Sequence, residues 1–167
     1  MITQRQATEE ELASALADMR RFDDRIDGLR AQYRMASAAL QSGELSQQEF
    51  VDGINKWLLP QWRALYSELA ANAPDDGSLT ALVRKRLIGA AIGWNRGLEE
   101  YATGLQERSY ASVMAAFDHM SDGNEARREA WRALDRAELG VSSRPGDPHP
   151  PRSGPDAPPT TVSHLPR

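Results

Sequence analysis

Apolar side chains recur every three or four residues along the first quarter of the chain. They occupy Leu12, Leu16, Met19, Phe22, Ile26, Leu29, Tyr33, Ala36 and Leu40, a mean spacing of 3.5 residues. This repeat is typical of a helix that packs lengthwise against neighbouring helices. Thr8 and Glu11 form a capping box at its start, and Gly43 can adopt the left-handed conformation that ends a helix. The pattern predicts one helix of about 35 residues, or roughly 50 Å.

A second helix is predicted to begin almost at once, because Ser46 and Glu49 form another capping box. Its apolar stripe comprises Phe50, Ile54, Trp57, Leu58, Trp62, Leu65 and Leu69. Pro60 lies inside this stripe, where it removes a backbone donor and crowds the carbonyl group four residues earlier. Because the stripe continues across the proline, we expect one kinked helix rather than two separate helices. Residues 73–78 read as a turn, with Ser78 as the next N-cap.

Two further amphipathic helices follow. The third carries Leu79, Val83, Leu87, Ala90, Trp94, Leu98, Tyr101 and Leu105, and the fourth carries Tyr110, Val113, Phe117, Met120, Asn124, Arg127, Trp131 and Leu134. Neither proline nor glycine marks the boundary between them, which we place near Arg108 and Ser109, with Ser109 as the cap. Asn124 and Arg127 interrupt the fourth apolar seam. They either make a buried polar contact that fixes the register of the helices or orient a ligand inside an apolar groove.

The predicted fold class is all-α. Four helices of similar length, joined by turns of about three to six residues, favour an antiparallel up-down-up-down four-helix bundle. The first helix is predicted to be the longest. If its apolar seam extends beyond the other helices it needs a partner, which favours dimerisation.

Composition changes abruptly near Gly140. Eight of the ten prolines lie in residues 141–167, which contain only three large apolar residues. Such a segment buries too little surface to offset the entropy of ordering, so we expect a disordered, proline-rich tail. The predicted domain organisation is therefore a helical bundle over residues 1–140 and a tail over residues 141–167.

Several classes of protein are disfavoured by composition. The absence of cysteine excludes disulfides and thiol nucleophiles. No apolar run reaches the length of about 18 residues that a membrane-spanning helix needs, and the first residues do not resemble a secretory signal. We therefore expect a cytoplasmic protein. Residues 1–140 hold 17 basic and 22 acidic residues, a balance that disfavours nucleic-acid binding.

The histidines do not form a metal site in the sequence. None of His119, His149 and His164 has a glutamate three residues earlier, as a di-iron bundle requires, and no two lie four residues apart, as a helical zinc site requires. We expect neither a metal nor a cofactor. Histidine phosphotransfer through His119 is the least favoured hypothesis, because Asp122 stands where a phosphotransfer bundle carries a lysine, and its charge repels a phosphoryl group.

Gly89, Gly93 and Gly97 lie four residues apart along one face of the third helix. Three glycines cost this helix roughly 2–3 kcal/mol of intrinsic propensity, so something must offset them. One explanation is close packing against another helix or against a large side chain, with Trp57, Trp62 and Trp131 as possible fillers. The other is a groove for a ligand or partner. The candidate groove consists of Gly89, Gly93, Trp94, Gly97, Tyr101, Asn124 and Trp131.

The heptad seams and the lack of a catalytic motif together favour a non-enzymatic protein. The first hypothesis is a helical bundle that acts by protein–protein interaction, as an adaptor, a scaffold or a self-associating module. The alternative is a small-molecule-binding bundle with its site along the glycine stripe. The basic triplet at residues 84–86 spans about 200° of a helix, so it does not form a single patch for phosphates.

Overall fold

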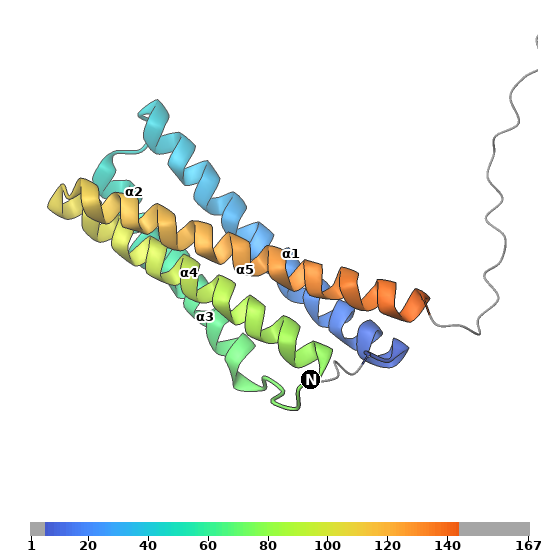
Figure 1. Cartoon of the computed structure of the whole chain (residues 1–167). Helices are drawn as coiled ribbons and strands as arrows, with labels where there is room; N and C mark the ends of the chain where they lie inside the picture. Colours follow the sequence, from blue (N-terminus) through green and yellow to red (C-terminus); the bar gives the residue numbers. More distant parts are fainter. Residues whose placement is uncertain (1–5, 144–167) are drawn as a thin grey trace, which may run out of the picture.

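The computed structural model describes residues 6–143, which form helices and no strand. Helix α1 (Glu9–Ser42) is followed by a helix in three continuous parts: α2 (Gln47–Gly53), a π-helical turn η1 (Ile54–Leu58) and α3 (Leu59–Ala71). Helices α4 (Leu79–Glu107) and α5 (Tyr110–Ser142) complete the fold. Successive rods run in opposite directions, and α4 and α5 lie side by side along their length (Figure 1). The predicted all-α, up-down-up-down four-helix bundle is confirmed.

The helix starts lie where the sequence placed them. At α1 the Thr8 hydroxyl accepts the Glu11 N–H at 3.1 Å, and the Glu11 carboxylate accepts the Thr8 N–H at 2.8 Å. Ser46 and Glu49 make the same reciprocal pair. The hydroxyls of Ser78 and Ser109 cap α4 and α5. These contacts satisfy N–H groups that have no partner within the helix.

The predicted distortion at Pro60 takes the form of a wider turn. The helix continues across the proline, as its apolar stripe indicated, but residues 54–58 adopt π-helical geometry, in which the Leu59 N–H donates to the Ile54 carbonyl. The wider turn lies directly before the residue that cannot donate and whose ring crowds the preceding turn. It also changes which residues face the core. Trp57, predicted to belong to the buried stripe, is 66% exposed.

The core is centred on α3 and α4. The rings of Trp62 and Trp94 stack with centroids 5.1 Å apart and nearly parallel planes. Tyr33 meets Trp94 edge-on, and Tyr101 contacts Tyr33, Phe50 and Phe117 in the same manner. This cluster joins all four rods.

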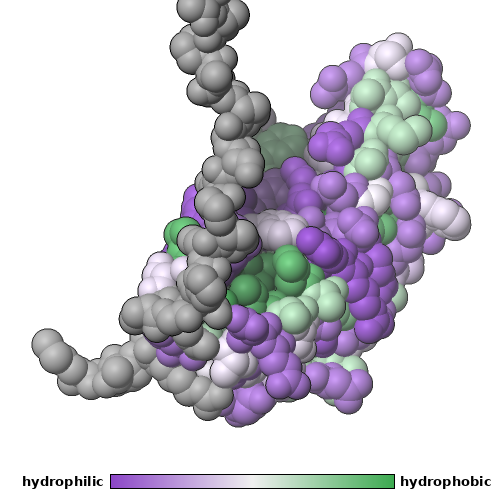
Figure 2. Space-filling model, turned by 90° about the vertical axis from the view of Figure 1, so that its right-hand side faces the viewer, coloured by the Kyte–Doolittle hydropathy of each residue, from purple (hydrophilic) through white to green (hydrophobic). Residues whose placement is uncertain are grey.

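Helix α1 leaves the bundle in its second half. Its last buried residue is Leu29, and Met35 is 73% exposed. In Figure 1 this end of α1 rises away from α5. Seen from the opposite end of the bundle, the same projection carries part of the hydrophobic surface, and a more strongly hydrophobic patch lies below it near the middle of the view (Figure 2). The extension of α1 beyond its neighbours follows the sequence prediction.

Helix α5 continues through Ser142, two residues beyond the predicted end of the bundle at residue 140. The proline-rich tail otherwise lies outside the described residues. Within residues 6–143, every helix is too short or too polar to cross a lipid bilayer.

The half-buried phenol of Tyr33 is expected to make the bundle sensitive to alkali. Burial, followed by the neighbouring Tyr101, raises the pKa of Tyr33 from 10.0 to about 12. An unfolded chain loses this proton near pH 10 and the folded chain near pH 12, so stability is expected to fall as the pH rises between these values. Tyr33→Phe should remove part of that loss in unfolding curves measured on either side of pH 10. The exposed Tyr110→Phe is the control, and equal alkaline loss in both variants would contradict the assignment.

Candidate binding site

The glycine stripe of α4 is filled by the backbone of α5. A Cβ atom added at Gly93 would lie 2.6 Å from the His119 carbonyl oxygen and 2.7 Å from the Gly123 nitrogen. At Gly97 it would lie 2.9 Å from the Ala116 carbonyl oxygen. At Gly89 the nearest atom is a methyl group at 3.4 Å, an ordinary contact. Close helix packing therefore accounts for Gly93 and Gly97, and α5 itself, rather than a tryptophan, is the filler.

Sequence reasoning missed the counterpart of this stripe. Gly123 was not included in the candidate groove, yet a Cβ atom added at Gly123 would lie 2.9 Å from the Ala90 carbonyl oxygen. The signal was present in the sequence, since α5 carries its own small residues at heptad spacing. They are Ser112, Ala116, Gly123, Ala126, Ala130 and Ala133.

The other predicted site residues lie beside this contact. The Trp94 Nε1–H donates to the Asn124 Oδ1 at 3.1 Å, and Tyr101 belongs to the aromatic cluster. Asn124 and Trp131 line a cavity of about 130 Å³ between α1 and α5. The structure thus brings together Asn124 and Trp131 but places the glycines on a different, closed face.

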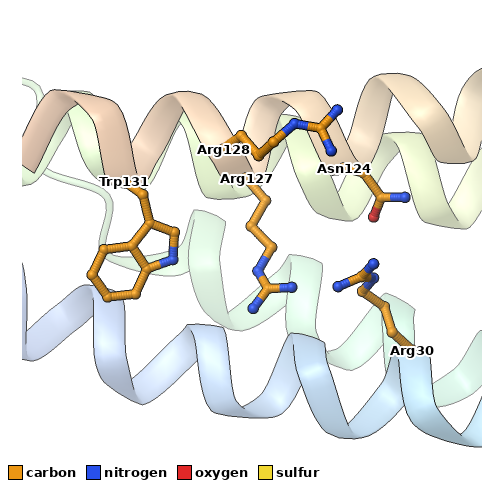
Figure 3. Close-up of a pocket in the computed structure, with 5 residues that line it drawn as sticks. All are labelled: Arg30, Asn124, Arg127, Arg128 and Trp131. Carbon is orange, nitrogen blue, oxygen red and sulfur yellow. The ribbon is translucent and has the colours of Figure 1, made fainter.

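Three arginines complete the lining of this cavity (Figure 3). Arg127 and Trp131 project from α5 toward α1, and Arg30 projects from α1 toward Asn124. Arg128 extends along the outer side of α5. Arg30 and Arg128 were not predicted, because the sequence does not show which turn of the first helix faces which turn of the fourth.

Arg127 is neutralised by two carboxylates of α1. Its Nε and Nη2 donate to Asp23, and its Nη1 donates to Asp27 at 2.9 Å. Hydrogen bonding to Asp23 raises the pKa of Arg127. The polar-contact explanation of Arg127 therefore holds, because the pair ties α5 to α1 at a specific register.

Arg30 is less well neutralised. Its one described ion pair, with Asp27, is 3.4 Å long. Burial, and then the charges of Arg127 and Arg34, lower the pKa of Arg30. Arg34 makes no ion pair with any residue in the described range. The cavity therefore combines a partly desolvated cation, an amide and an indole wall.

The basic triplet at residues 84–86 is divided by the fold. Arg84 is buried over the ring of Phe22, where it donates to Asp18 at 2.6 and 3.0 Å and to the Leu69 carbonyl at 3.2 Å. Lys85 and Arg86 are exposed. Only two of the three cations thus reach solvent.

His119 lies on α5, where this helix packs against α4. Its Nε2 is 3.1 Å from a carboxylate oxygen of Glu100. Its backbone carbonyl contributes to the contact with Gly93. His149 and His164 lie outside the described residues, among which no cluster of three potential metal ligands occurs.

Exposed apolar residues form a second candidate surface. Met35 and Trp57 border an apolar groove of about 240 Å³ between α1 and η1. The Trp57 Nε1–H and the Gln61 side chain both donate to the Gln32 Oε1, each at 3.1 Å, and this fixes the indole at the groove edge. On α5, Tyr110, Met114 and Phe117 are also exposed, although the sequence predicted Tyr110 and Phe117 to be buried in the seam.

Comparison of the chain with known protein families, with curated proteins and with solved structures finds no match.

Proposed function

We propose that this chain acts by protein–protein interaction rather than by catalysis, as a helical module that associates with a second copy of itself. The observation that carries the proposal is the groove bordered by Met35 and Trp57, where α1 leaves the bundle. Tryptophan and methionine are enriched at protein interfaces, and a tryptophan held rigidly at a groove edge loses little entropy on binding. Isolated exposed apolar residues are common, but two that share a groove indicate a contact surface.

The α1 side of this groove is complementary to itself. Seven residues lie on one face of the helix around Met35 and carry no charge: Gly28, Ala31, Gln32, Met35, Ala38, Ala39 and Ser42. We name these residues the α1 face. In an antiparallel pair centred on Met35, Ala31 lies opposite Ala39 and Gly28 opposite Ser42. A two-fold dimer requires this kind of self-complementary surface, and small residues allow the two helices to approach closely.

Light scattering after size exclusion tests the proposal with two exposed methionines as a matched pair. The wild-type chain is expected to be a dimer at tens of micromolar. Met35→Glu should give a monomer, because it places two carboxylates at the centre of the pair. Met114→Glu, on the exposed surface of α5, should remain a dimer. Circular dichroism establishes that both variants are folded.

Cysteine cross-linking tests the geometry, since the chain has no cysteine of its own. In the antiparallel arrangement, chains with Ala31→Cys alone should not form a disulfide, because Cα atoms more than about 7 Å apart cannot be bridged. A mixture of Ala31→Cys and Ala39→Cys chains should cross-link. A monomeric wild-type chain, or a dimer that Met35→Glu leaves intact, would refute self-association through the α1 face.

A further inference from the structure

The cavity lined by Arg30, Asn124, Arg127, Arg128 and Trp131 lies away from the α1 face and has a different chemistry. Arg127 and Trp131 of α5 and Arg30 of α1 project into the space between the two helices (Figure 3). Three of its five lining residues are arginines.

Among the arginines that line the cavity, Arg30 has the most unused donors. Arg127 has each of its three nitrogens engaged by Asp23 or Asp27, and Arg128 pairs with Glu125 on its own helix at 2.7 Å. Arg30 has only the 3.4 Å contact with Asp27, which leaves its Nε and second terminal nitrogen without an acceptor among the described residues. A guanidinium group in this state favours a planar oxyanion, which it can bind with two parallel hydrogen bonds.

The surrounding charge also favours an anion. Arg34 stands close enough to Arg30 to repel it, and no carboxylate in the described part of the chain pairs with Arg34. Arg127 repels Arg30 as well, even though two carboxylates neutralise most of its charge. A bound anion would relieve the repulsion among these cations.

The Asn124 side chain at the cavity edge has a fixed orientation. The indole nitrogen of Trp94 can only donate, so the Asn124 oxygen must face it, and the Asn124 Nδ2 points elsewhere. No described residue accepts a hydrogen bond from this amide group. Trp131 supplies a flat apolar wall, and about 130 Å³ is close to the volume of cavities that hold a single six-membered ring.

We propose that this cavity binds a small oxyanion, a carboxylate or phosphate group, through Arg30, with Trp131 as an apolar wall for a ring attached to a carboxylate. Two features separate it from a general cationic surface. Its lining residues come from different helices, and an indole adjoins the guanidinium group of Arg30. Neither feature depends on dimerisation, so the proposal can be tested on the chain in either oligomeric state.

The test is a titration of the full-length, ¹⁵N-labelled chain with benzoate, benzamide or inorganic phosphate. Benzoate and benzamide have nearly the same shape and differ in charge. Benzoate is expected to shift the Trp131 indole and Asn124 amide signals to saturation, while benzamide leaves them unchanged. If phosphate shifts the same signals, the oxyanion has an inorganic source. Binding of benzoate alone would identify an organic acid.

Arg30→Gln should weaken anion binding about tenfold or more, because a hydrogen bond to a charged group is lost. The matched control is Arg96→Gln on α4, an exposed arginine without an ion pair in the described structure, which should bind like the wild type. Thermal unfolding establishes that both variants are folded. The proposal is overturned if neither anion binds, if benzamide binds as well as benzoate, or if Arg30→Gln binds like the wild type.

Discussion

Gly93→Ala is expected to destabilise the bundle by about 3 kcal/mol, at the upper end of the range for overpacking a core. The added methyl group would lie 2.6–2.7 Å from three backbone atoms of α5, and a backbone cannot move aside as a flexible side chain can. Helices α4 and α5 would have to separate along their length. Chemical unfolding, with the free energy extrapolated to zero denaturant, measures the effect.

Gly89→Ala is the control, one turn earlier on the same helix. Its methyl group would meet only the Ala126 Cβ, at 3.4 Å, so the higher helix propensity of alanine should dominate and stabilise the chain by up to about 1 kcal/mol. The two substitutions are chemically identical and are expected to have opposite signs. A Gly93→Ala chain as stable as Gly89→Ala would show that α4 and α5 are not in backbone contact.

The helices themselves could be predicted from the sequence because the signals for them are local. A capping box such as Thr8 with Glu11 spans one turn, and the apolar repeat of each helix is contained within it. Pro60 shows the limit of this reasoning. The sequence indicated that the helix would continue through the proline, but it did not indicate the π-helical turn that exposes Trp57.

Features that depend on how one helix faces another could not be predicted. The partner of Gly93 is Gly123, thirty positions later, and the partner of Arg127 is Asp23, more than a hundred positions earlier. A single sequence gives the composition of each face but not the rotation and axial shift at which two faces meet. This is why Asn124 and Trp131 were predicted as site residues while Arg30, across the cavity from them, was not.

The ion pair between Asp23 and Arg127 offers a further test of that register. Asp23→Ala is expected to cost about 3 kcal/mol, because removing one partner of a largely buried pair leaves the other charge poorly compensated. Unfolding by denaturant measures the loss. The neighbouring exposed acid gives the control, since Asp24→Ala should change stability by less than about 0.5 kcal/mol.

Asp23→Ala should lower the stability of the bundle but raise the affinity of the cavity for an anion. Without Asp23, Arg127 keeps only its bond to Asp27 and regains free donors at Nε and Nη2. Asp23→Ala should therefore bind benzoate more tightly than the wild type while being less stable, and bound benzoate should recover part of the lost stability, since a ligand that binds only the folded chain stabilises it. A variant that loses stability without gaining affinity would show that the pair fixes the helix register but does not limit the positive charge available in the cavity.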